Sequence, residues 1–449
     1  MAIKVSLISL GCPKNQIDSE RMLAELKTAG MKIVKKPENS DVAIVNTCGF
    51  IESAAQEALS EIFALASLKS MGKLKKIIVT GCLPERYKND FLSELPEVDF
   101  ALGAGSYHKI KDAVLSVMKD ERSCCFDDSG KSPLNGERVL LSPSYTAYLK
   151  IAEGCDNHCA YCVIPSIRGP FRSRTEEDIL KEAESLSQSG VKELILVAQD
   201  LTRYGLDLYK ERALPSLLKK LAAVSGIKWI RLHYLYPDEI DDRLLDLIAE
   251  NEKILPYFDI PIQHINDRIL KSMNRRGDSA YIKALFSKIR KKVPGAVIRT
   301  SIIVGLPGET EEEFGELCAF LREAKLPRAG VFPYSMEEGS AAALMENQVD
   351  DETKSRRLEL VQNIQITVME EYNESCLGKT LTVLCEGFDA DTELYCGRSF
   401  ADSPEIDPKV FFESSPPPLP GQFVKVIITG AVDSDLTGRA IKQDGELNL

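Results

Sequence analysis

The stretch that decides the fold runs from residue 147 to 162 and reads Ala-Tyr-Leu-Lys-Ile-Ala-Glu-Gly-Cys-Asp-Asn-His-Cys-Ala-Tyr-Cys. Its first five residues form the apolar-rich run expected of a buried strand, and Cys155, Cys159 and Cys162 follow on one loop. Iron-sulfur clusters are bound by thiolates, so this loop can hold three irons of a four-iron cluster. The fourth iron would then be open to a small molecule, as the open position of a catalytic zinc is.

A structural zinc loop is the alternative interpretation of the same residues, with His158 as the fourth ligand. Structural zinc sites usually pair two Cys-x-x-Cys knuckles at a distance, and the sequence contains no second knuckle. The spacing therefore favours an iron-sulfur cluster.

Strand-like and helix-like stretches alternate downstream of this loop. The candidate strands are 147–151, 194–197, 229–233, 258–262, 298–304 and 330–333, and the candidate helices between them are 176–187, 214–223, 242–251, 280–291 and 311–324. Six such units predict a partial (βα)6 barrel over residues 141–376, with its chemistry at the carboxyl ends of the strands.

A second group of cysteines precedes the barrel. Apolar runs at 3–10, 42–45 and 77–79 alternate with helix-like stretches, which predicts an open parallel α/β sheet over residues 1–122. Each run leads into a cysteine, and these are Cys12, Cys48 and Cys82. One buried cysteine is usually only a small apolar residue. Three at the carboxyl ends of parallel strands share one edge of the sheet, so we expect these thiols to converge as ligands.

Residues 378–449 are expected to form a small antiparallel β-barrel. Short strand-like runs occur at 380–384, 395–400, 410–413, 424–428 and 436–441. A long helix that begins after Asp350 and ends near Gly378 connects this barrel to the preceding domain. Residues 121–144 lack a clear period and predict a linker between the first two domains.

Composition narrows the function classes. The chain has 449 residues and a formal net charge of −12, which does not favour nucleic-acid binding through bulk charge. No apolar run reaches the ~18 residues of a membrane-spanning helix or a typical secretory signal, so we expect a cytoplasmic protein. Cytosolic thiols stay reduced, so twelve cysteines indicate metal binding rather than disulfides. Six of them lack any partner spacing and are predicted to be structural: Cys124, Cys125, Cys318, Cys376, Cys385 and Cys396.

These motifs resemble those of the radical S-adenosylmethionine methylthiotransferases, and the resemblance covers essentially the whole chain. The loop at 155–162 is similar to the one with which such enzymes bind a 4Fe-4S cluster and S-adenosylmethionine. Cys12, Cys48 and Cys82 look like the three cysteines that bind a second 4Fe-4S cluster. The C-terminal barrel looks like the TRAM domain that ends these enzymes.

Two branches of the family must be separated. One modifies an adenosine of transfer RNA, and the other modifies an aspartate of the twelfth small-subunit ribosomal protein. Residues 12–20, 198–205 and 397–407 are similar to the second branch. Residues 378–449 also contain twelve acidic and six basic side chains, and such a domain should repel a transfer-RNA backbone and attract a basic ribosomal protein.

The resemblance implies an enzyme that methylthiolates the β-carbon of this aspartate. One cluster would generate a 5′-deoxyadenosyl radical, and the second would carry the sulfur. The implied partners are the ribosomal protein or the small ribosomal subunit, an external reductant and a sulfide or polysulfide donor. Two alternatives stay open: a transfer-RNA adenosine methylthiotransferase, and a non-enzymatic iron-sulfur protein that docks on the ribosome.

Polar groups at the barrel mouth are the candidates for holding S-adenosylmethionine. The resemblance places Tyr161 next to the adenine, and the ends of the barrel strands supply the others, which are Gln199, Asp200, Gln263 and Arg299. The alternative role for these residues is stabilisation of the barrel mouth. The arginines that follow the cysteine loop favour a solvated basic run over contact with cofactor or substrate, and these are Arg168, Arg172 and Arg174.

Overall fold

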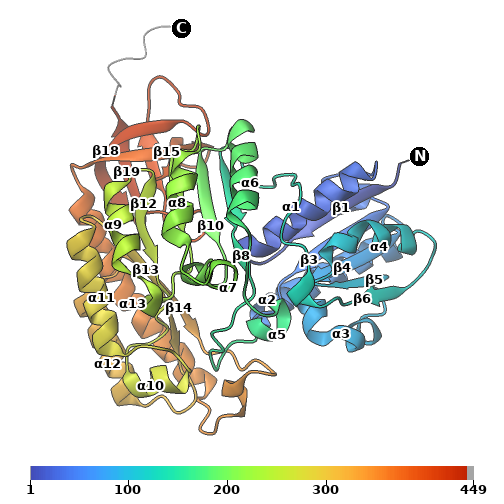
Figure 1. The fold of residues 1–449 in the computed structure, drawn as a ribbon, viewed down its shortest axis with the longest axis horizontal. Helices are drawn as coiled ribbons and strands as arrows, with labels where there is room; N and C mark the ends of the chain where they lie inside the picture. Colours follow the sequence, from blue (N-terminus) through green and yellow to red (C-terminus); the bar gives the residue numbers. More distant parts are fainter. Residues whose placement is uncertain (1, 442–449) are drawn as a thin grey trace.

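The chain folds into an open parallel sheet, a partial barrel and a small closed β-barrel, which confirms the predicted fold class (Figure 1). The computed structural model describes residues 2–441, except for the side chain of Asn89. In Figure 1 the blue N-terminal sheet lies beside the green and yellow barrel, and the red C-terminal strands lie at one end of that barrel. No helix among the described residues is long and apolar enough to cross a membrane.

The N-terminal sheet is parallel throughout, and its strand order is β2-β1-β3-β4-β5-β6. Its strands are β1 (Lys4–Ser9), β2 (Lys32–Ile33), β3 (Val42–Thr47), β4 (Lys76–Gly81), β5 (Phe100–Gly103) and β6 (Ser123–Cys125). One face packs against α1 (Pro13–Thr28) and α4 (Ile110–Val117), and the other against α2 (Glu52–Ser70) and α3 (Cys82–Glu94). The strand order reverses between β1 and β3, and ligands bind at such a point in open α/β sheets.

The predicted linker at 121–144 is wrong at its beginning. Residues 123–125 form β6, which pairs in parallel with β5 at the edge of the sheet. Three residues are too few to show the alternation that marks a strand in sequence. The sequence signal was therefore absent, although the strand is present.

The six strands of the central domain run in chain order and leave the barrel open between β14 and β7. They are β7 (Thr146–Lys150), β10 (Glu193–Val197), β11 (Trp229–Leu232), β12 (Ile254–Asp259), β13 (Val297–Val304) and β14 (Arg328–Pro333). The helices between them are α6 (Glu176–Gln188), α8 (Leu214–Ala223), α9 (Asp242–Glu250), α11 (Ser279–Lys292) and α12 (Glu311–Ala324). The strand predicted at 258–262 begins earlier, at Ile254, and ends at Asp259, so Gln263 lies in the loop beyond it.

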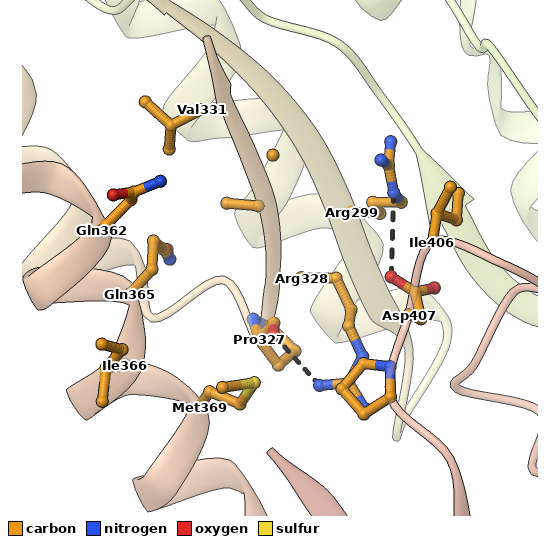
Figure 2. A pocket seen from close by; sticks show the side chains of 13 residues that line it. Arg299, Pro327, Arg328, Val331, Gln362, Gln365, Ile366, Met369, Ile406 and Asp407 are labelled. Carbon is orange, nitrogen blue, oxygen red and sulfur yellow. Dashed lines mark hydrogen bonds and ion pairs between the residues drawn. The ribbon is translucent and has the colours of Figure 1, made fainter. Parts of the chain in front are cut away.

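A long helix connects this barrel to the C-terminal domain. The Asp350 carboxylate accepts a hydrogen bond from the Thr353 backbone N–H and caps α13 (Asp351–Cys376), which packs along β14 (Figure 2). The closed barrel that follows has the order β15-β16-β17-β19-β18. Its strands are β15 (Thr380–Asp389), β16 (Leu394–Arg398), β17 (Val410–Glu413), β18 (Phe423–Val432) and β19 (Asp435–Ala440).

The segment 397–408 of the C-terminal domain closes the amino end of the central barrel. Arg398 donates to Glu193, the first residue of β10, at 2.6 Å. Arg328, the first residue of β14, donates to Asp402 at 2.7 Å. These side chains are buried, and a buried charge is tolerated only when it is paired. The ion pairs therefore fix the C-terminal domain on the barrel.

Glu193 is the centre of this contact. Burial disfavours its charge, yet the adjacent guanidiniums of Arg398 and Arg231 lower its pKa from the ordinary value of 4.5 to about 2. A carboxyl with a lowered pKa stabilises the folded state above its ordinary pKa, and this stabilisation disappears as the pH falls toward the lowered value.

We predict that Glu193→Gln lowers the free energy of unfolding by about 3–5 kcal/mol at pH 7, because the buried guanidinium of Arg231 loses its only carboxylate and that of Arg398 keeps only Glu386. The difference from the wild type should shrink as the pH falls from 4.5 toward about 2, where the wild-type carboxyl becomes protonated. Fluorescence of Trp229, the single tryptophan, reports this interface during urea unfolding because its ring packs against Phe423 of β18. Glu184→Gln, exposed on α6, should stay within about 0.5 kcal/mol of the wild type. Equal effects of the two substitutions would contradict the assignment.

Candidate functional site

Three cysteines of the N-terminal sheet lie at one edge, where neighbouring strands end. Cys12 follows β1 and caps α1, Cys48 follows β3, and Cys82 begins α3 directly after β4. Because β1, β3 and β4 are adjacent and parallel, the topology alone brings the three thiols to the same edge.

Glycines allow the three loops to approach one another closely. Gly11 has a φ of +83°, and a Cβ atom there would lie 2.6 Å from Cβ of Cys48. Gly81 has a φ of +101°, and a Cβ atom there would lie 2.5 Å from the Thr47 carbonyl oxygen. Neither conformation nor spacing tolerates a larger residue, so the cysteine loops depend on these glycines.

The second set of cysteines lies on the loop between β8 (Ala152–Glu153) and α5 (Ile164–Arg168). The Cys155 backbone N–H donates to the Gly169 carbonyl at 3.1 Å, which closes the loop at its base. The middle of the loop is held at Ala160, whose N–H donates to the Met273 carbonyl at 2.9 Å. Its carbonyl accepts from the Ala342 N–H at 2.8 Å. The loop is thereby fixed from both sides.

Both sets of cysteines line a single cavity of about 300 Å³. Figure 1 shows α5 between the sheet and the barrel, where the two sets of loops meet. The other lining residues are Lys14, Phe50, Asn157, Tyr161, Ile164, Arg168, Gln199, Tyr234, Leu235, Tyr236, Pro261, Gln263 and Arg275. The cavity therefore contains six thiols, several aromatic rings and three amide side chains.

The geometry gives no support to the zinc alternative. Residues 2–441 contain no group of three or more His, Cys, Asp or Glu side chains that could hold a single metal ion. His158, the fourth zinc ligand in that alternative, is exposed and has a left-handed φ of +48°. In a four-iron cluster each thiolate binds a different iron, so its ligands lie further apart than those of one ion.

Burial controls the protonation of these thiols. It raises the pKa of Cys48 and Cys162 to about 12 and that of Cys155 to about 11, and neighbouring thiols add to the shift. Without a bound cation Cys48, Cys155 and Cys162 consequently keep their protons. Thiolate is the form that binds metal, so ligation must release protons.

Comparisons with known proteins identify each of the three units. Residues 4–103 match the uncharacterized protein family UPF0004, residues 149–321 match the Radical SAM superfamily, and residues 377–441 match the TRAM domain. Ribosomal protein uS12 methylthiotransferase RimO of Pelotomaculum thermopropionicum is 48% identical over 98% of this chain and 100% of its own length. The protein of that name from a Thermoanaerobacter species is 47% identical over 97% of this chain and 99% of its own.

The chain belongs to the RimO family of ribosomal protein uS12 methylthiotransferases.

Solved structures share the fold at low sequence identity. The radical S-adenosylmethionine methyltransferase TsrM from Kitasatospora setae, with cobalamin and a 4Fe-4S cluster bound, aligns with a TM-score of 0.53. It is 12% identical and covers 85% of this chain and 81% of its own. The likeness shows a shared fold.

Three of the predicted S-adenosylmethionine contacts line the cavity of this RimO family member, namely Tyr161, Gln199 and Gln263. Gln263 adopts a left-handed φ of +69°, a sparsely populated conformation that concentrates at functional sites. Asp200 does not line the cavity itself but contacts a residue that does. It is buried and accepts a hydrogen bond at 2.9 Å from Asn157, which itself lines the cavity.

Arg299 does not join them, which corrects the prediction for this residue. It is the third residue of β13, so its side chain lies near the amino end of the strand rather than at the carboxyl edge. Its Nη1 donates to Asp259 at 3.0 Å, and its Nε lies 3.8 Å from Asp407 (Figure 2). The separate cavity drawn there lies beside α13 and the C-terminal domain, away from the thiols.

Four buried charges join the sheet to the barrel next to the cysteines. Lys150 at the end of β7 donates to Asp18 of α1 at 2.6 Å and to Glu153 of β8 at 2.7 Å. Arg168 at the end of α5 donates to Asp18 at 2.7 Å and to Glu153 at 3.3 Å. All four side chains are at most 5% exposed. Burial opposes ionisation of Glu153, yet Lys150 and Arg168 hold its pKa well below the ordinary range.

Sequence analysis missed several residues of the site. It interpreted Arg168 as part of a solvated run, but this guanidinium is buried and also donates to Sγ of Cys82 at 3.4 Å. Arg275 was not considered, and it lies 3.8 Å from Sγ of Cys159 and 4.2 Å over the Tyr236 ring. Arg275 follows α10 (Asp267–Ser272), outside any cysteine motif, so the sequence offered no signal for it.

We predict that Asp18→Asn weakens the junction of sheet and barrel by about 3–5 kcal/mol, since Lys150 and Arg168 would then share one carboxylate. Calorimetry at pH 7 should show the N-terminal sheet melting at a lower temperature than in the wild type. Glu25→Gln, exposed on the same helix, is the matched control and should change the stability by less than about 0.5 kcal/mol. An unchanged melting profile for Asp18→Asn would show that the ion pairs do not hold the two domains together.

Proposed function

We propose that this chain is a radical S-adenosylmethionine enzyme that transfers a methylthio group to the β-carbon of an aspartate in ribosomal protein uS12. The observation that carries the proposal is the shared cavity, because two sets of three thiols from different domains face one space. Membership of the RimO family supports both the transferase class and this substrate.

The residues present fit the implied cofactors. The Radical SAM domain takes a 4Fe-4S cluster and S-adenosylmethionine, and we assign the cluster to Cys155, Cys159 and Cys162. We assign a second 4Fe-4S cluster to Cys12, Cys48 and Cys82. Each set offers soft thiolate ligands and no carboxylate, which is the donor chemistry of iron-sulfur clusters. Three ligands in each set leave one iron open in each cluster.

The amide side chains of the cavity fit the polar groups of S-adenosylmethionine. Gln199 donates through Nε2 to Glu153 at 2.5 Å, which fixes its orientation. Its Oε1 is buried and has no hydrogen-bond partner among the described residues. A buried acceptor of this kind calls for a donor from a ligand, and the ammonium and ribose hydroxyls of S-adenosylmethionine provide such donors. Gln263 and Tyr161 supply further contacts from the same wall.

A 4Fe-4S cluster held by Cys155, Cys159 and Cys162 would supply the electron for reductive cleavage of S-adenosylmethionine, and one held by Cys12, Cys48 and Cys82 would supply a site for sulfur. The protein contributes position and exclusion of water. An unactivated C–H bond offers no handle for acid-base chemistry, so the walls must hold the substrate carbon still and shield a reactive radical. The rings of Tyr161, Tyr234 and Tyr236 form part of these walls.

The three domains divide the work in this proposal. Residues 1–122 hold the second cluster, residues 141–376 hold the radical cluster and S-adenosylmethionine, and residues 378–449 bind the substrate. Two acids of the last domain, Asp402 and Asp407, face the central barrel and are not available to a partner. The remaining described residues of this domain leave eight acidic and four basic side chains at least partly exposed, an excess that suits a basic ribosomal protein. Residues 442–449, which the charge count from sequence included, lie outside the described residues.

The substrate is tested by anaerobic turnover followed by mass spectrometry. The reconstituted protein with S-adenosylmethionine, an external reductant and sulfide or polysulfide should add a methylthio group to one aspartate of uS12 in the small ribosomal subunit. Bulk transfer RNA, offered in parallel, should stay unmodified. An adduct on adenosine instead would assign the chain to the transfer-RNA branch. Absence of S-adenosylmethionine cleavage would favour a non-enzymatic iron-sulfur protein.

Substitutions should distinguish the roles of the two sets of cysteines. We predict that Cys48→Ala reduces the iron content of the reconstituted protein and abolishes sulfur insertion, while cleavage of S-adenosylmethionine stays measurable. Cys159→Ala should abolish the cleavage itself. Cys124→Ala, half-buried and outside the cavity, should retain the full iron content and both activities. Methylthiolation by Cys48→Ala would refute the assignment of the second cluster.

A further inference from the structure

The cavity that holds the six thiols has an unbalanced set of charges. Its described lining residues include three cations, Lys14, Arg168 and Arg275, and no aspartate or glutamate. A cation lining an enclosed space normally has an anion close by, because burial of an unpaired charge is costly. The three cations differ in the partners that they have within the protein.

Two of the cations are satisfied by the fold. Arg168 forms ion pairs with Asp18 and Glu153. Arg275 donates to the Pro261 carbonyl and stacks on the Tyr236 ring at 4.2 Å. Arg168 is therefore paired with carboxylates, and Arg275 is held by a carbonyl, a thiol and a ring.

Lys14 shares with Arg275 the lack of a carboxylate partner, but it has the weakest hydrogen bonding of the three cations. It is 9% exposed, and its Nζ donates only to the Ala198 carbonyl, at a long 3.4 Å. The Tyr234 ring lies 4.1 Å from Nζ and offers its π face. No carboxylate in the described part of the chain lies within 4.0 Å of this ammonium. The nearby Glu153 is already bound to Lys150, Arg168 and Gln199.

The surroundings hold this ammonium at a defined place. Lys14 is the second residue of α1, two positions after the cap residue Cys12, so its side chain starts beside the N-terminal thiols. Tyr234, whose ring contacts the Lys14 ammonium, has a left-handed φ of +64°. Such strain in a non-glycine residue persists only where the surrounding structure imposes it, and it concentrates at functional sites. Lys14 therefore presents a fixed positive charge beside the thiols of one domain and the strand ends of the other.

We infer that Lys14 binds the side-chain carboxylate of the substrate aspartate and selects aspartate over its neutral amide. This inference rests on the proposed function. The reacting β-carbon is bonded directly to the carboxylate carbon, so anchoring the carboxylate at Nζ holds the β-carbon inside the cavity that both sets of thiols line. A charge-assisted hydrogen bond away from water is stronger than one between neutral groups, and an asparagine side chain cannot form it.

The test compares Lys14→Met with the wild type on two substrates: uS12, and uS12 in which the modified aspartate is replaced by asparagine. Met has a similar length and no charge, and it removes a buried ammonium, so the variant is expected to fold. The wild type should bind uS12 about 10- to 100-fold more tightly than the asparagine form, as measured by calorimetry. In Lys14→Met this ratio should fall toward one, while the affinity for S-adenosylmethionine and its cleavage without substrate stay unchanged.

Two further variants keep the test decisive. Lys14→Arg retains the charge and should retain most of the preference for aspartate. Lys271→Met, exposed on α10, should leave the ratio unchanged. A preference that survives in Lys14→Met would overturn the inference, and so would a loss of affinity for S-adenosylmethionine alone, since Lys14 would then serve the cofactor carboxylate. If the wild type modifies uS12 and only the ratio fails to respond, the proposed function stands without this inference. If the wild type neither binds nor modifies uS12, both fail.

Discussion

The buried charges that join the sheet to the barrel are the constraint on which the rest of the site depends. Asp18 lies on the helix that Cys12 caps, while Glu153 precedes Cys155 and Arg168 follows Cys162 by six residues. The ion pairs among them hold both cysteine sets against one space. An apolar junction would tolerate sliding of the two domains. Paired charges with hydrogen-bond geometry tolerate little, because a small displacement leaves a buried charge without its partner.

The opposite end of the barrel uses the same chemistry for another purpose. Glu193 and Arg328 are the first residues of their strands, Arg231 is the third residue of β11, and all three bind the C-terminal segment 397–408. The segment that resembles the ribosomal-protein branch in sequence therefore closes one end of the barrel. Its contacts fix the position of the C-terminal domain on the barrel. The central barrel has polar groups at both ends and a packed interior between them. Arg299 lies on the side of the C-terminal segment, so it interacts with Asp259 and Asp407 and does not reach the cavity.

Sequence analysis succeeded where topology alone determines position. Parallel strands end at one edge, so the convergence of Cys12, Cys48 and Cys82 followed from three apolar runs and the cysteine two or three residues after each. It failed where a side chain depends on distant partners. Arg168 looked like a solvated residue because Asp18, its main partner, is 150 positions away in the chain. The sequence also did not show that Arg299 lies near the amino end of β13 and not at the carboxyl end. A three-residue edge strand such as β6 has no period to detect.

The charge of the cavity lining and the net charge of the whole chain have opposite signs in this protein. The net charge suits recruitment of the substrate, and the charge of the lining suits binding inside the cavity. The chain carries a formal net charge of −12, whereas the described lining of the cavity includes three cations and no carboxylate. Long-range attraction to a basic ribosomal protein depends on the outer surface, where water and salt weaken every interaction beyond roughly 10 Å. Inside the cavity the three cations act on a ligand at short range, where water and salt screen them little. Cations there can stabilise thiolates and bound carboxylates without weakening the attraction outside. An acidic enzyme can therefore recruit a basic partner and still hold an anionic side chain at its centre.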